Sequence, residues 1–278
     1  MNFISNYILN LLLLLLINTV CIGQKSIEQL DKCKLAERLY RFEEDSTKQG
    51  SPLSQALLDS AIRICPDYSM AYMEKSVAFN KTGDLYNGFL WLNKAVAMDP
   101  INHLGYRGWI KLRKLRDFKG AQKDFKKLQT LTNNPMVWGE HIYSLLGECK
   151  LGLNEPDSAI YYYDKYIKVT TTTLGEDYVD IYAFVLSGIA HYKSKRYTYA
   201  LDNFDKAILH YSSCTEAIYY KALLLYNTGK NKEALILIEK AKDNFEKEKY
   251  RADKYNEVIY QLYYSDIIES LSLFSKRK

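Results

Sequence analysis

A short pattern of small and large residues recurs along this chain at a spacing of about 34 residues. It reads Ala200-x-x-x-Phe204-x-x-Ala207 and returns as Ala234-x-x-x-Ile238-x-x-Ala241. Earlier copies, each followed by a proline, are Ser54-x-x-x-Leu58-x-x-Ala61 and Gly88-x-x-x-Leu92-x-x-Ala95. Small and large residues that repeat at this period are typical of helical hairpins stacked side by side. The sequence therefore predicts an all-α fold.

The array is expected to contain about six hairpins, each with two helices of ~12 to 14 residues. We expect a signal peptide at residues 1–23, an N-terminal segment at 24–34, the repeat array at 35–245, and a capping helix with a basic tail at 246–278. Apolar residues at helical spacing predict that 250–275 form the capping helix, because the last hairpin of an open stack needs covering. The alternative is a free amphipathic helix for a partner or a membrane.

One junction between hairpins is expected to be an extended loop. Four consecutive threonines, Thr170 to Thr173, precede Leu174 and Gly175. Threonine is β-branched and a poor helix former, so this stretch predicts non-helical chain between two hairpins.

The repeated residues resemble those of the tetratricopeptide repeat family. The resemblance covers roughly residues 35–245 and is carried by Gly188, Tyr197, Ala200, Phe204 and Ala207, together with Gly83, Ala95 and Pro100. It implies a right-handed superhelical solenoid whose first helices line a concave surface, and a role in binding protein or peptide segments. The first, third and fourth hairpins depart from the family pattern at several positions, so the repeat count stays open.

The amino terminus has the pattern of a secretory signal peptide. An apolar run lies within residues 1–23, and short residues precede Gln24, so cleavage after Gly23 is expected. In a second interpretation Cys21 becomes the lipid-bearing first residue of an outer-membrane lipoprotein, and in a third the segment stays as an uncleaved anchor. All three place residues 24–278 outside the cytoplasm, as a periplasmic or extracellular protein.

Export would change the meaning of the cysteines, because disulfides persist in oxidising compartments. Cys33 and Cys65 fall at neighbouring ends of the first predicted hairpin, where a disulfide would staple the end of the array. Two buried free thiols are the alternative. Cys149 and Cys214 belong to different hairpins and are expected to be core thiols.

Composition and motifs argue against several function classes. The formal net charge of +5 is spread among many acidic residues, which does not suggest nucleic acid as a partner. A cluster at Arg107, Lys111, Arg113, Lys114 and Arg116 is interpreted as a solvated face. The chain has no catalytic motif and no Cys or His spacing typical of a metal site, so we expect no enzyme activity, cofactor or metal. An enzyme of a new type would need a polar pocket with a strongly shifted pKa.

The resemblance also implies which side chains face the groove. The positions that correspond to the family's ligand-facing residues are Arg107, Lys111, Lys114, Tyr182, Ile189, Tyr192, Tyr219, Leu223 and Tyr226. The groove would be basic at its middle and aromatic toward its far end, which suits an extended or helical segment with acidic and apolar groups. The alternative is that the tyrosines only pack one helix on another.

Two functions follow from these observations. The first is a non-catalytic scaffold that binds a protein or peptide partner in the groove, with a membrane as partner only if Cys21 is lipidated. The second is a lipid-anchored structural subunit of an assembly in the cell envelope. Mass spectrometry of the mature amino terminus distinguishes them.

Overall fold

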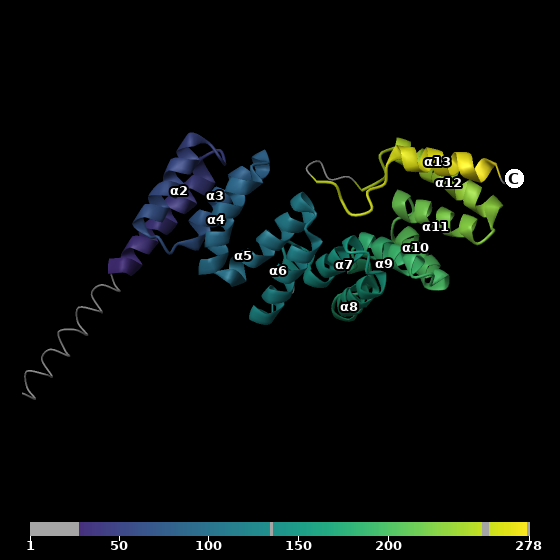
Figure 1. Cartoon of the computed structure of the whole chain (residues 1–278), viewed down its shortest axis with the longest axis horizontal. Coiled ribbons are helices and arrows are strands. Elements are labelled where there is room, and N and C mark those ends of the chain that lie inside the picture. The colour runs from purple at the N-terminus through teal and green to yellow at the C-terminus, as the bar shows by residue number, and fades with distance from the viewer. Residues whose placement is uncertain (1–27, 134–135, 252–255, 277–278) are drawn as a thin grey trace, which may run out of the picture. The chain divides into compact units, whose positions relative to one another are not determined.

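The computed structural model describes residues 28–133, 136–251 and 256–276. The chain divides between His103 and Leu104 into two compact units, each of which is described by itself (Figure 1). The expected signal peptide and Cys21 lie outside the described residues. Among the described residues, no helix is long and apolar enough to cross a membrane.

The first unit consists of paired helices whose boundaries follow from their capping residues. It contains a helix at residues 28–46, then α2 (Pro52–Ile64), α3 (Ser69–Thr82) and α4 (Leu85–Met98). The Ser51 side chain caps α2 by accepting from the Ser54 amide. Gly83 ends α3 with a φ of 86°, a left-handed conformation that glycine adopts without strain, and Asp84 caps α4. The first helix includes residue 28, so helical structure begins before the expected start of the array at residue 35.

The second unit continues the same pairing. In chain order it contains most of α5 (Pro100–Ile110), the π-helical turn η1 (Lys111–Leu115), α6 (Phe118–Leu131), β1 (Met136–Val137), β2 (Glu140–His141), α7 (Ile142–Gly152), α8 (Pro156–Thr173), the 3-10 turn η2 (Glu176–Tyr178), α9 (Ile181–Lys193), α10 (Tyr197–His210), α11 (Thr215–Asn227), α12 (Asn231–Glu246) and α13 (Tyr264–Ser275). Helices α7 with α8, α9 with α10, and α11 with α12 form antiparallel hairpins, and α13 packs on α11 and α12.

Each hairpin of the second unit packs a large side chain of its second helix on a small residue of its first helix. A Cβ added to Gly188 would lie 2.5 Å from the Phe204 ring, and one added to Gly147 would lie 2.7 Å from the Tyr163 ring. The last hairpin has Ala222 and Ile238 at the same two positions, both fully buried. The recurring small and large residues therefore set how closely the paired helices approach.

Two predicted elements are wrong in their extent. Thr170 to Thr173 are helical within α8, where Thr170 is buried and the Thr172 and Thr173 hydroxyls donate to carbonyls of the preceding turn. The capping helix spans only Tyr264–Ser275, not 250–275, because the described residues before it are non-helical and Tyr260 has a φ of 52°. The buried side chains before this helix, Val258, Ile259 and Leu262, have the spacing of a helix although their backbone is not helical.

One element has no counterpart in the prediction. A two-stranded antiparallel hairpin, β1 with β2, separates α6 from α7, and its turn residues Trp138 and Gly139 have φ values of 50° and 83°. Two successive positive φ values are typical of the tight hairpin turn whose twist matches that of the strands. The Trp138 ring stacks on Tyr106 at 4.7 Å between ring centroids.

Candidate functional site

The candidate site is the surface that the first helices of successive hairpins form in the second unit. We call the surface of α7, α9 and α11 the A-helix face. Helix α9 contacts both α7 and α11, so the three helices run side by side and together present one face. Residues predicted to line the groove at Tyr182, Ile189, Tyr192, Tyr219, Leu223 and Tyr226 belong to α9 and α11.

The predicted basic residues of the third hairpin are paired with an acidic side chain of that hairpin. The Arg107 guanidinium donates to both oxygens of Asp124, at 2.9 and 2.7 Å. The Lys111 ammonium lies 2.7 Å from Asp124 Oδ2, and Asp124 is buried. Lys114 is half-buried in η1. Arg107 and Lys111 thus pair with a side chain of α6, and their role in a basic groove stays a prediction.

Two other residues of this hairpin reach the next hairpin instead. Trp109 Nε1 donates to Glu140 at 2.9 Å, and the Arg113 guanidinium pairs with Glu140 at 2.6 Å and with Glu148 of α7. Arg113 and Glu148 are both buried. Burial disfavours the charged guanidinium, but the Glu148 and Glu140 carboxylates hold the pKa of Arg113 above its ordinary value. The predicted solvated face is wrong for Arg113, because its side chain is buried against Glu140 and Glu148. The sequence pattern did not point to Trp109, although it directly follows Gly108, the small residue beneath Phe125.

The aromatic residues near the end of the array pack against the chain itself. The Tyr226 ring stacks on Phe274 of α13 at 4.2 Å, and the Tyr219 hydroxyl lies 3.3 Å from Ser270 Oγ. Leu223 packs against the apolar cluster that contains Phe274. Helix α13 thus covers α11 in the way expected of a cap, and it does so on the predicted ligand-facing residues.

The described chain between α12 and α13 covers the neighbouring part of the A-helix face. We call residues 247–251 and 256–263 the strap; Figure 1 shows it leaving α12 and returning to α13. The Thr215 hydroxyl donates to the Lys249 carbonyl, and the Arg251 amide donates to Glu216 Oε1 at 2.6 Å. The Arg251 guanidinium lies 4.7 Å from the Tyr182 ring centroid. These contacts fix one end of the strap on α9 and α11.

The other end of the strap is buried through its apolar side chains. Val258, Ile259 and Leu262 are each less than 8% exposed. Ile259 joins the cluster that contains Ile189 of α9, while Tyr260 lies 5.6 Å from the Lys193 ammonium and 6.4 Å from the Tyr220 ring. The Arg116 guanidinium donates to the Glu257 carbonyl at 3.1 Å. The strap is thus held by its backbone and by its apolar side chains.

The A-helix face carries a buried carboxyl group, that of Glu216, where the strap begins. Burial raises the pKa of Glu216, while the Arg251 amide, the Arg251 guanidinium and the Tyr182 hydroxyl act in the opposite direction. Burial also raises the pKa of Tyr182. A buried carboxylate beside an aromatic ring is suited to a guanidinium or an ammonium group. This end of the face therefore favours a basic side chain.

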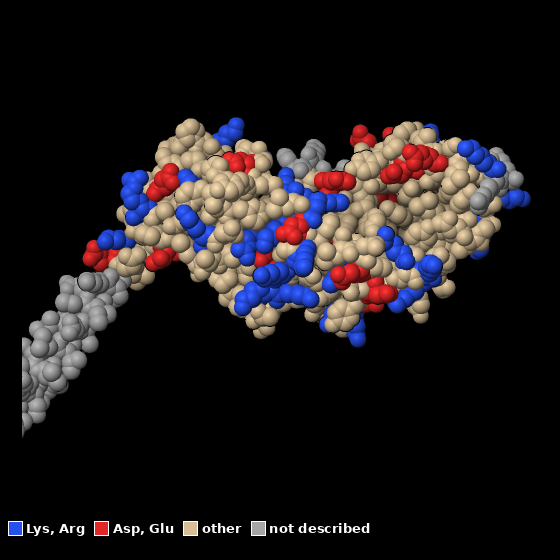
Figure 2. All heavy atoms as spheres, viewed as in Figure 1, with Lys and Arg blue, Asp and Glu red and all other residues tan. Residues whose placement is uncertain are grey.

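The exposed basic surface of the second unit lies on a second helix instead. Lys119, Lys123, Lys126 and Lys127 of α6 are all exposed. Figure 2 shows Lys and Arg side chains gathered over α6 in the middle of the view. These lysines follow helical spacing opposite the buried Ala121 and Phe125, which is the signal that locates them in the sequence.

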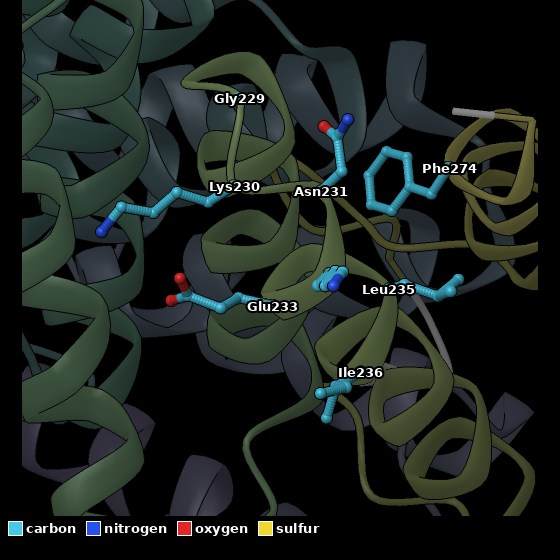
Figure 3. Close-up of a pocket in the computed structure, with 8 residues that line it drawn as sticks. Gly229, Lys230, Asn231, Glu233, Leu235, Ile236 and Phe274 are labelled. Atoms are coloured by element: carbon cyan, nitrogen blue, oxygen red, sulfur yellow. The ribbon is translucent and has the colours of Figure 1, made fainter. Parts of the chain in front are cut away.

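Two hollows lie away from the strap. One, of about 710 Å³, is lined by Gly229, Lys230, Asn231, Lys232, Glu233, Leu235, Ile236 and Phe274, between the start of α12 and the end of α13 (Figure 3). The other, of about 440 Å³, lies beside Tyr143, Tyr161 and Lys165. Within the described ranges no group of three or more His, Cys, Asp or Glu residues is placed to hold a metal ion.

Of the four cysteines considered in the sequence analysis, two form a disulfide and two are buried thiols. Cys33 and Cys65 form a disulfide between the helix at 28–46 and the end of α2. Cys149 and Cys214 are buried thiols, and burial raises the pKa of Cys214 to about 12. A thiol with so high a pKa is a poor nucleophile at neutral pH, which fits a packing role.

Comparison with known proteins identifies the repeat. Residues 185–249 match the family described as Tetratricopeptide repeat. PilF of Pseudomonas aeruginosa has a similar structure with a TM-score of 0.57 and 14% sequence identity, over 92% of this chain and 100% of that chain. MamA of Desulfovibrio magneticus RS-1 has a TM-score of 0.55 and 16% identity, over 64% of this chain and 96% of that chain.

A third similar structure is YrrB, described as a TPR protein with an unusual peptide-binding site. It has a TM-score of 0.54 and 18% identity, over 67% of this chain and 91% of that chain. No curated protein sequence matches the chain with comparable significance. The family match and the structural likenesses confirm the predicted class, an all-α solenoid of paired helices.

Proposed function

We propose that this chain, whose residues 185–249 match the tetratricopeptide repeat family, is a non-catalytic scaffold that binds a protein or peptide segment on the A-helix face. One observation carries the proposal: α11 already holds a non-helical stretch of polypeptide by its backbone. Glu216 accepts from the Arg251 amide, and Thr215 donates to the Lys249 carbonyl. Contacts with the backbone do not depend on side-chain identity, so the same groups suit an extended segment of another protein.

The similar proteins support the same kind of role. YrrB is a peptide-binding protein by its description, and PilW, another similar structure, is described as a type IV pilus biogenesis factor. The predicted residues Tyr182, Ile189 and Tyr192 lie on the same helix of the face, α9. Their role in binding a partner stays a prediction.

Photo-crosslinking in the native cell tests the proposal. A photoreactive phenylalanine analogue replaces Tyr192, which is half-buried on α9, or Tyr199, which is exposed on the second helix α10. We expect a discrete crosslinked partner from position 192 and none from position 199. The same crosslinked proteins from both positions would show that contact with the A-helix face is not specific, and the proposed function would fail.

We also propose that the protein is exported, with a lipid anchor on Cys21 as the alternative. The disulfide between Cys33 and Cys65 supports export, because such bonds persist in oxidising compartments. The intact mass of the mature protein tests both forms. A chain that begins at Gln24 supports cleavage, an acylated Cys21 supports the envelope-anchored subunit, and an intact amino terminus on a cytoplasmic protein contradicts both.

A further inference from the structure

The strap has the properties of a ligand bound to the A-helix face. The described part has no helix or strand of its own, and its polar contacts with the rest of the chain include Thr215, Glu216 and Arg116. Within the strap, the Gln261 side chain donates to the Arg251 carbonyl and the Tyr263 hydroxyl donates to Glu257. Its apolar side chains Val258 and Ile259 are buried, although no regular element positions them. The strap therefore depends on the face for its conformation.

The strap also occupies residues that were predicted to bind a partner. Arg251 lies over the ring of Tyr182, and Ile259 shares an apolar cluster with Ile189. A partner segment that reached these two residues would meet the strap first. The strap and the partner are therefore competitors for one surface.

The strap is separable from the cap that follows it. Helix α13 is fixed to α11 by its own contacts, the Tyr226 ring on Phe274 and the Tyr219 hydroxyl near Ser270. Tyr260 of the strap has a φ of 52°, which is unfavourable for a residue other than glycine and persists only where contacts hold it. Leaving the face would relieve this strain while α13 stays in place.

We propose that the strap is a built-in occupant of the A-helix face, and that a partner segment of the same chemistry displaces it. This inference rests on the proposed function and names its partner class. The partner carries a basic residue whose side chain lies over Tyr182 and whose amide donates to Glu216, followed by an aliphatic residue for the cluster around Ile189, as the strap does with Arg251 and Ile259. The strap keeps the face closed to segments that lack this pattern.

A peptide added to the full-length protein tests the displacement. The probe is a fluorescein-labelled peptide with the sequence of residues 249–263, and the readout is fluorescence anisotropy. The wild-type protein should bind it weakly, because the tethered copy competes at an effective concentration in the millimolar range. Ile259→Asp in the protein places a carboxylate in an apolar cluster and frees the face, so we expect at least tenfold tighter binding.

Matched controls separate strap release from general loosening of the fold. Ser272→Asp adds the same charge on the exposed side of α13 and should leave binding at the wild-type level. A peptide that itself carries Ile259→Asp should not bind either protein. If the Ile259→Asp protein does not fold, as judged by circular dichroism, Arg251→Ala replaces it, with a smaller but measurable gain expected.

The outcomes decide between the inference and the proposed function. Equal affinity of the peptide for wild-type and folded strap variants, or no binding to either, overturns the inference. A specific crosslink from position 192 would in that case leave the scaffold function standing with a fixed strap. Binding of the peptide without any crosslinked partner would instead leave the strap as an occupant and remove the proposed function.

Discussion

The contact of Gly188 with Phe204 predicts a measurable coupling between the two helices of the fifth hairpin. A methyl group on Gly188 would lie 2.5 Å from Phe204 Cε1, about 1 Å closer than ordinary van der Waals contact. Overpacking of this kind costs about 1–3 kcal/mol, and the better helix propensity of alanine offsets about 1 kcal/mol. We expect Gly188→Ala to destabilise the fold by up to about 2 kcal/mol.

The last hairpin suggests the compensating change. There the corresponding residues are Ala222 and Ile238, both fully buried. Phe204→Ile alone should cost about 1–2 kcal/mol, because it leaves space above Gly188. Combined with Gly188→Ala, the added methyl group fills that space, so the double variant should be more stable than the sum of the single effects by at least about 1 kcal/mol.

Urea unfolding followed by circular dichroism gives the three free-energy differences. Hydrogen exchange of the amides in α9 and α10 shows whether the loss is confined to this hairpin, as in an array whose units contact mainly their neighbours. Effects that add within about 0.5 kcal/mol would refute the argument, since the two side chains would then not share one space.

Three further predictions concern the cap of α7, the buried ion pair and the disulfide. Burial lowers the pKa of His141, whose Nδ1 accepts from the Tyr143 amide at the start of α7, so stability present above pH ~6.5 should be lost as the pH falls through the lowered pKa. His141→Asn should reduce this loss, measured as the difference in melting temperature between pH 7 and pH 5. An equal difference for wild type and variant would contradict the prediction. Arg113→Met leaves the buried Glu148 carboxylate without its partner and should lower the free energy of unfolding by about 3–5 kcal/mol. The double variant Arg113→Met with Glu148→Leu should recover most of this loss. Equal urea midpoints for the two variants would argue against the pairing. Reducing the bond between Cys33 and Cys65 should cost about 3–4 kcal/mol, and a melting temperature insensitive to reductant would show that the loop is constrained by other means.

The sequence predicts the fold well where the repeat keeps its register. Gly188 with Phe204 and Ala222 with Ile238 stand at the same spacing, so α9 to α12 follow directly from the pattern. In the third hairpin the π-helical turn η1 changes the order of side chains around the helix. The resemblance selects Arg107, which lies in α5 before this turn and which the structure pairs with Asp124.

The strap could not be predicted by periodicity for a different reason. Val258, Ile259 and Leu262 are buried at a spacing that an amphipathic helix would also produce. Their burial comes from contact with a preformed surface, and Tyr260 lies in a backbone conformation that interrupts a helix. For the threonines of α8 the error is the reverse, because a loop was predicted and the chain is helical. Burial of Thr170 outweighs the low helix propensity of these residues, and the Thr172 and Thr173 hydroxyls donate to carbonyls of the same helix.

A tether at both ends of the strap has a thermodynamic consequence for any ligand of the face. The observed dissociation constant equals the intrinsic one divided by the fraction of molecules in which the strap is open. Substitutions that never touch the ligand, such as those at the Phe274 and Tyr226 contact that anchors the following helix, therefore change affinity by shifting that fraction. Packing of the last helix, at a distance from the bound segment, would therefore set the affinity of the face for its ligand.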